Sequence, residues 1–215
     1  MKRRDVLYGA AALVPSLAVG QVPAVEEWSF DRLQSLPVRT SGHPALTDSP
    51  WGQAMLFDGK EDALFIDRHP LAGARRFTFE AVFRPDGGPF EQRWFHLETP
   101  ESPDQLPGTS AMRIMFEIRV KDRGWYLDAF MTGPGYRQAL MAPDRLYPLG
   151  QWHHVMQSYD GRIYRSFVNG APQVEVAMPF APQGPGRCAV GARLNGVNHF
   201  RGAVHMARFT RDPVF

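Results

Sequence analysis

Hydrophobic and polar side chains alternate between Met112 and Lys121, with Met115 as the one exception, which is the pattern of a β-strand with one buried face. The apolar row consists of Met112, Ile114, Phe116, Ile118 and Val120, and the opposite row of Arg113, Met115, Glu117, Arg119 and Lys121. Because side chains repeat every two residues along a strand, neighbours in the second row lie about 7 Å apart on one face. Residues 125–131 show the same period after a turn at Gly124. We expect the two segments to form neighbouring strands.

Two further stretches show the strand period. Residues 76–84 place three phenylalanines on one face, which predicts a strand packed against a core. Residues 91–98 predict another strand, with Trp94 and His96 on one side and Phe95 on the other. The prolines and glycines between such segments suit many short strands and turns rather than helices.

Residues 151–170 predict a pair of hairpins. Asp160-Gly161 joins two alternating segments, and Asn169-Gly170 follows the second one. Both dipeptides are typical of two-residue hairpin turns, because glycine accepts a positive φ. Trp152 stands at the start of the first strand, and we expect it to be a large core residue.

Three segments resemble laminin G-like domains of the concanavalin A-like lectin/glucanase superfamily. Residues 151–170 match their W-H-x-V…Y-D-G…V-N-G centre, and residues 56–66, LFDGKEDALFI, resemble their F-D-G-x-D-D-x-(V/I) opening. Residues 190–214 resemble their closing (I/V)-G…F-x-G-x-I-D-E-V-R-(I/F) segment. The resemblance spans residues 53–214 and implies an all-β jelly-roll sandwich of two antiparallel sheets. It does not identify a ligand.

The resemblance and composition together divide the chain into three parts. With 215 residues, of which 44% are hydrophobic, the chain is long enough for one large all-β domain. We assign residues 51–215 to the jelly roll and residues 21–50 to a proline-containing lead-in, in which a short helix or an edge strand is expected at 28–36. Residues 1–20 are interpreted as an export signal.

The first twenty residues begin with Lys2-Arg3-Arg4, followed by an apolar run too short to span a bilayer comfortably. The arginine pair before two apolar residues resembles a twin-arginine signal, and an ordinary secretory signal is the alternative. Either signal predicts an exported protein, periplasmic or extracellular, with no transmembrane segment in the mature chain. Cys188 is the only cysteine, so an internal disulfide is impossible, and we expect it to be a buried structural residue.

Net charge argues against a nucleic-acid partner. The chain carries 24 basic and 22 acidic side chains, and three of the basic and one of the acidic ones lie in the first twenty residues. The remainder is therefore balanced and has no basic field that would attract a phosphate backbone.

A calcium site is considered at Asp58 and Asp62, because carboxylates in turns supply the hard oxygen ligands that Ca²⁺ prefers. The alternative is that Asp58 accepts hydrogen bonds from its own turn. Pentraxin-like relatives place calcium ligands in the loop that corresponds to residues 193–199, which has no carboxylate here. The turn interpretation is therefore favoured, and no cofactor is required.

The polar row of residues 112–121 is the main candidate for a carbohydrate-binding face. Arg113, Glu117 and Arg119 would join Tyr126 and Asp128 of the next strand, so that charged groups pair with hydroxyls and an aromatic ring covers a sugar. Tyr136 and Asn195 are candidates in the loops at the rim. The alternative is a solvated outer face whose ion pairs contribute little.

Three functional classes follow. A lectin-like domain that binds a polysaccharide or glycan is favoured. An enzyme on the same jelly roll, a polysaccharide lyase or glycoside hydrolase, is second, although the E-x-D-x-x-E run of related glucanases is missing and residues 115–119 match only half of the R-x-E-x-R motif of related lyases. A structural or adhesion module with an unknown protein partner is third.

Overall fold

The structure is a computed structural model that describes residues 25–33 and 36–213. The proposed export signal at residues 1–20 lies outside these ranges. The described residues form sixteen strands and contain no helix that is long and apolar enough to cross a membrane.

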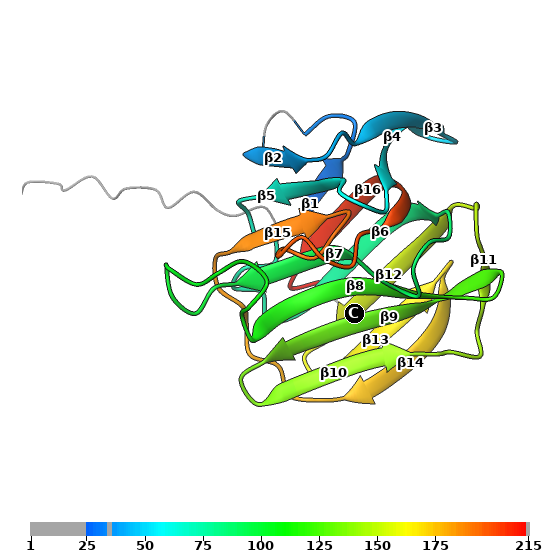
Figure 1. Cartoon of the computed structure of the whole chain (residues 1–215). Helices are drawn as coiled ribbons and strands as arrows, with labels where there is room; N and C mark the ends of the chain where they lie inside the picture. The colour runs from blue at the N-terminus through cyan, green and yellow to red at the C-terminus, as the bar shows by residue number, and fades with distance from the viewer. Residues whose placement is uncertain (1–24, 34–35, 214–215) are drawn as a thin grey trace, which may run out of the picture.

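The strands form two antiparallel sheets, which lie in two layers (Figure 1). Sheet 1 contains β1 (Val25–Ser29), β3 (Ala45–Ser49), β4 (Gly52–Asp58), β6 (Phe77–Pro85), β12 (His153–Tyr159), β13 (Ile163–Val168), β14 (Ala171–Ala177) and β16 (Arg201–Arg211). Sheet 2 contains β2 (Val38–Ser41), β5 (Ala63–Ile66), β7 (Glu91–Thr99), β8 (Met112–Lys121), β9 (Gly124–Gly133), β10 (Tyr136–Met141), β11 (Tyr147–Pro148) and β15 (Arg187–Val190). The expected all-β sandwich is confirmed.

Aromatic side chains fill the space between the two sheets. Phe83 of β6 stacks on Trp94 of β7 with ring centroids 4.3 Å apart, and Trp94 stacks on Phe116 of β8 at 5.4 Å. All three side chains are fully buried. Gln157 of β12 also crosses the core and donates its Nε2 to the carbonyl oxygen of Met115 in β8 at 3.1 Å. These contacts hold β8 against the opposite sheet and determine which of its faces is left outside.

The predicted hairpins are confirmed. Asp160 accepts two backbone hydrogen bonds through Oδ1 at the β12–β13 turn, where Gly161 has φ 101°. Asn169 and Gly170 both have positive φ, 49° and 77°, at the β13–β14 turn. Two successive positive φ values twist the chain in the sense that suits the flanking strands.

The strands β1, β2 and β3 correct the expected start of the sandwich at Trp51. They pair with β16, β5 and β4, so the described part of residues 21–50 belongs to both sheets. The expected helix or strand at 28–36 is in part the strand β1, and residues 34–35 lie outside the described ranges. The lead-in has no long alternating run, which is why its strands were missed.

A β-bulge corrects the expected orientation of the side chains in β7. The pairing of β7 with β8 shifts between Gln92 and Phe95. Because a bulge inserts one residue, it reverses the alternation beyond it. Trp94 and Phe95 therefore both enter the core, while His96 lies on the outer face of sheet 2.

Trp152 is not the core residue that was expected. It is only partly buried and lies just before β12, in contact with the exposed Trp51 at 6.1 Å and with His205 at 6.5 Å between ring centroids. Strand period placed Trp152 on the correct face with His154, but that face is the outer one; the inward side chain at the start of β12 is His153.

Candidate functional site

The polar row of β8 lines a hollow on the outer face of sheet 2. The expected pairing with β9 is present, with Glu117 opposite Asp128 and Arg119 opposite Tyr126. The hollow has a volume of ≈ 500 Å³ and draws side chains from β7 to β10 and from the loop after β15. Its lining consists of Arg93, Arg113, Met115, Glu117, Arg119, Asp128, Phe130, Arg137, Ala139, Met141 and Arg193.

An ion-pair network occupies one end of the hollow. Arg119 donates Nη2 to Glu117 at 3.0 Å and to Asp128 at 2.7 Å, and its Nη1 lies 2.9 Å from Glu91. Arg93 donates Nε to Glu117 at 3.0 Å. The side chains of Glu117 and Asp128 are each only 3% exposed, so water screens this network weakly.

The two carboxyl groups of this network bind protons more tightly than usual. Burial, and then the nearby Asp128, raises the pKa of Glu117 to about 7, although Arg93 and Arg119 oppose the shift. Burial also raises the pKa of Asp128, in spite of its hydrogen bond to Arg119. The network therefore holds two carboxyl groups that titrate above their ordinary range.

The other end of the hollow is cationic. The guanidinium groups of Arg113 and Arg137 lie 5.8 Å from the centroid of the Phe130 ring, each within the reach of a cation–π contact. Arg193 enters from the loop after β15 and donates Nη2 to the carbonyl oxygen of Gly108 at 2.6 Å.

The predicted binding residues divide into two groups. Arg113, Glu117, Arg119 and Asp128 line the same hollow, as expected. Tyr126 is on the expected face of β9 but is 8% exposed and is not part of the lining.

The two candidates at the rim lie elsewhere. Tyr136 was expected in a loop, but it begins β10 and belongs to the core, where its hydroxyl donates to the carbonyl oxygen of Ala181 at 3.2 Å. Asn195 is exposed in a turn beside Gly108 and does not line the hollow.

The sequence interpretation missed Arg93 and Arg193 as members of the site. Arg93 lies within the β7 bulge, where simple alternation fails, and its Nη1 donates to Asn198 in the loop after β15 at 2.6 Å. Arg193 reaches the hollow because β15 pairs with β7, and the two strands are far apart in the sequence. No local pattern identifies either residue.

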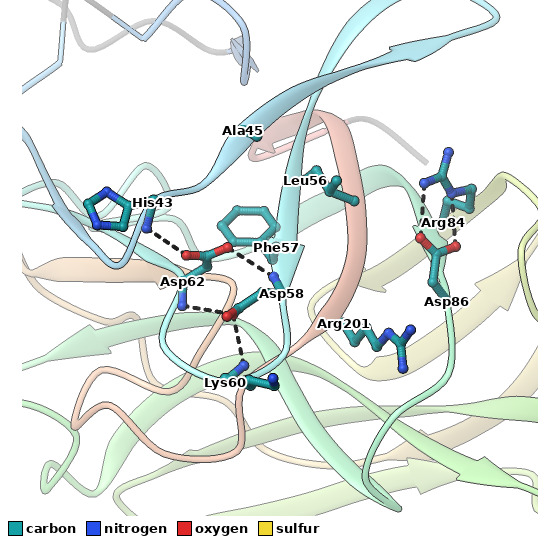
Figure 2. A pocket seen from close by; sticks show the side chains of 10 residues that line it. All are labelled: His43, Ala45, Leu56, Phe57, Asp58, Lys60, Asp62, Arg84, Asp86 and Arg201. Carbon is teal, nitrogen blue, oxygen red and sulfur yellow. Dashed lines mark hydrogen bonds and ion pairs between the residues drawn. The ribbon is translucent and has the colours of Figure 1, made fainter.

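The two calcium candidates use their oxygens for backbone hydrogen bonds (Figure 2). Asp58 accepts through Oδ1 from the amides of Lys60, Glu61 and Asp62 at 2.8–3.1 Å. Asp62 accepts from the amides of His43 and Asp58 at 2.7 and 3.0 Å. Within residues 25–33 and 36–213, no three histidine, cysteine, aspartate or glutamate side chains gather as a metal site. Asp58 thus accepts hydrogen bonds from its own turn, as the favoured interpretation predicts.

Comparison of the sequence with protein families identifies the class of protein. The family described as the concanavalin A-like lectin/glucanases superfamily matches residues 58–214, which is more than half of the chain. The chain therefore belongs to this superfamily. No curated protein matches the sequence.

Several solved structures have a similar fold. Domain 4 of AbnA, a GH43 extracellular arabinanase from Geobacillus stearothermophilus in complex with arabinotriose, has a TM-score of 0.62 at 15% identity, covering 86% of this chain and 90% of that one. The CBM40 of Ruminococcus gnavus IT-sialidase, bound to α2,6-sialyllactose, has a TM-score of 0.52 at 14% identity and covers 66% and 79%. The Crh5 transglycosylase in its apo form has a TM-score of 0.54 at 13% identity and covers 89% and 86%. At these identities the likeness shows the shared fold.

Proposed function

We propose that this protein binds carbohydrate in the hollow on sheet 2. The proposal rests on one observation. The hollow combines the partly exposed ring of Phe130 with fixed charged groups on both sides of it. An aromatic ring can cover the apolar face of a sugar, and ionised side chains form strong hydrogen bonds with its hydroxyls. The complexes of similar structures with arabinotriose and sialyllactose support this function.

The ion-pair network suits a binding site because its side chains hold one another in place. Arg119 is held by three carboxylates, and Arg93 by Glu117 and by the amide oxygen of Asn198. Side chains that are held in place before binding lose less conformational entropy when a ligand arrives. The hollow can therefore bind sugar hydroxyls without reorganising its floor.

The test is a glycan array, run with and without Ca²⁺, followed by calorimetry on the ligands that bind. Phe130→Ala is expected to weaken binding by about tenfold or more, because the ring would lose its contact with the sugar. Trp51→Ala is the matched control, since Trp51 is 59% exposed and lies on the outer face of sheet 1. If only Trp51→Ala weakened binding, the site would be on sheet 1. An array without any ligand would contradict the proposal.

Binding is favoured over cleavage by the partners of Glu117. Its raised pKa would suit a general acid, but both of its oxygens accept hydrogen bonds from guanidinium groups. Proton donation to a glycosidic oxygen would require one of these bonds to break. An assay for released reducing ends or unsaturated products on the bound glycans tests the enzyme alternative, and activity lost in Glu117→Gln would establish it.

We further propose that the protein is exported before it meets its ligand. The support is the basic start and apolar run of residues 1–20, which resemble a twin-arginine signal. Replacing Arg3-Arg4 with two lysines is expected to block export by that route. Unchanged export would indicate the ordinary secretory route. Mass spectrometry that found an intact Met1 start on secreted or periplasmic protein would contradict the interpretation as a signal.

A further inference from the structure

The hollow on sheet 2 holds more positive than negative charge. Its lining includes five arginines and two carboxylates. Within the described part of the chain, the arginine–carboxylate ion pairs of this face belong to Arg93, Arg119 and Arg187. Arg113 and Arg137 take part in none of them, and the Nε of Arg113 is buried without a hydrogen-bond partner.

Glu98, on the same face, forms no ion pair with Arg113. Glu98 lies directly across from it in the pairing of β7 with β8. However, Glu98 is fully buried and is held by Arg187 at 3.0 Å and by the amides of Gly108 and Ser110 at 3.2 and 3.3 Å. Its oxygens are therefore directed away from the hollow and toward the loop before β8.

The excess positive charge affects the groups around it. Burial, and then the nearby Arg193, lowers the pKa of Arg113, although the charge of Glu98 opposes the shift. His96 lies fully buried on the same face, and burial followed by repulsion from four arginines holds its pKa well below the ordinary range. A half-buried guanidinium that has other arginines nearby and no ion-pair partner costs stability, and its contact with the Phe130 ring is the interaction it makes in the hollow.

We propose that the hollow binds an anionic saccharide, whose carboxylate or sulfate lies between Arg113 and Arg137 while the sugar ring covers Phe130. This inference rests on the proposed carbohydrate binding and adds the class of ligand. The two guanidinium groups approach the same aromatic ring, so one sugar can contact all three side chains. Guanidinium donors pair with carboxylate and sulfate oxygens through charge-assisted hydrogen bonds, which are stronger than neutral ones. At the other end of the hollow, where carboxylates neutralise Arg119, the hydroxyls of a neighbouring sugar can bind.

The first experiment compares charged polysaccharides with matched neutral forms. The probes are polygalacturonate, alginate and hyaluronan with their carboxyl-reduced derivatives, and heparin with its desulfated form, together with neutral arabinan and xylan. We expect tight binding to a charged polysaccharide and loss of that binding after carboxyl reduction or desulfation. Which of the two treatments abolishes binding shows which anionic group is recognised. Equal binding to charged and neutral forms overturns this inference and leaves carbohydrate binding intact. Binding to no member of the panel contradicts the proposed function itself.

The second experiment uses variants of Arg113 and Arg137, the two arginines that approach the Phe130 ring. Arg113→Gln and Arg137→Gln are each expected to weaken binding of the anionic probe by about tenfold and to reduce its salt dependence. Arg123→Gln and Arg162→Gln are the controls, because both side chains are exposed in turns outside the hollow. Equal losses in the control variants would indicate general attraction to a polyanion and would overturn the assignment.

Stability separates a binding role from a structural role. Because Arg113 has no carboxylate partner and its charged form is disfavoured by burial, Arg113→Gln is expected to leave the melting temperature unchanged or to raise it. A binding loss with unchanged or higher stability supports the proposal. A lower melting temperature with unchanged binding would show that Arg113 is structural and would overturn it.

Discussion

The outer faces of the two sheets both carry many charged side chains, but the ion pairs on the two faces differ in their exposure to solvent. On sheet 1 the ion pairs are more open to water, most of all that of Arg208 with Glu27, whose side chains are 45% and 51% exposed. On sheet 2, Arg119 pairs with carboxylates that are 3% exposed. Exposed pairs contribute little to stability, whereas breaking a buried pair leaves an uncompensated charge. The comparison supports the proposal that the binding site is on sheet 2, where the charged groups are held in buried pairs.

The largest difference between the faces is expected from removal of Arg119. Arg119→Ala would leave Glu117 and Asp128 buried without their shared donor, and we expect a loss of about 3–5 kcal/mol in the free energy of unfolding. The control is Arg165→Ala on sheet 1, which breaks pairs with Asp160 and Glu175 and should cost about 0–1 kcal/mol. Urea unfolding measures both values. Similar losses for the two variants would show that the sheet 2 network is not effectively buried.

The pH dependence of stability should have opposite signs on the two sheets. Glu117 has its pKa raised to about 7, mainly by burial, so the stability that it contributes is complete below its unfolded pKa of about 4.5 and is lost as pH rises through 7. Asp160 in the β12–β13 turn has its pKa lowered to about 2, first by the backbone amide of Ile163 and then by Arg165. Its contribution is present above the ordinary value of 3.8 and is lost as pH falls through 2.

Two variants isolate these opposite contributions. Glu117→Gln should flatten the fall in stability between about pH 5 and pH 8, which we expect to be on the order of 2 kcal/mol. Asp160→Asn should leave that fall unchanged and instead reduce the loss of stability below about pH 4. Unfolding curves across the pH range test both. An unchanged slope near neutral pH in Glu117→Gln would contradict the assignment of that proton to Glu117.

A smaller effect is expected at the aromatic cluster on sheet 1. Trp152 is partly exposed and lies 5.3 Å from the guanidinium of Arg84, measured to the ring centroid. Trp152→Ala should therefore cost about 1–2 kcal/mol, against about 3–5 kcal/mol for Phe83→Ala in the core. Equal losses in urea unfolding would mean that Trp152 is packed as tightly as the core.

The smallest effect is expected from removal of calcium. Asp58 accepts backbone hydrogen bonds within the turn between β4 and β5, and Asp62 accepts them from the amides of Asp58 and His43, so these oxygens already have partners. Addition of EDTA should therefore change the melting temperature by less than about 1 °C. Asp58→Asn should cost about 1 kcal/mol because it weakens the turn. A clear drop with EDTA that is restored by Ca²⁺ would contradict the turn interpretation.

Residues that are close in the sequence could be placed in the fold from the sequence by itself. The alternation at 112–121 identified the inward row of β8, of which Ile114, Phe116 and Ile118 are fully buried. The turns at Asp160-Gly161 and Asn169-Gly170 were correct because their conformations depend on the residues in the turns themselves. The same local logic grouped Arg113, Glu117 and Arg119 with Asp128 across a single short turn.

The remaining features depend on tertiary structure because they involve segments that are distant in the chain. Strand period says which side chains share a face, but not whether that face is covered, so it could not show that Glu117 is buried or that Trp152 faces outward. The bulge at Gln92–Phe95 and the pairing of β15 with β7 bring Arg93 and Arg193 to the hollow. The net charge near zero also gave no sign of the excess of arginine in the hollow. Opposite charges cancel in a sum even when the fold separates them in space.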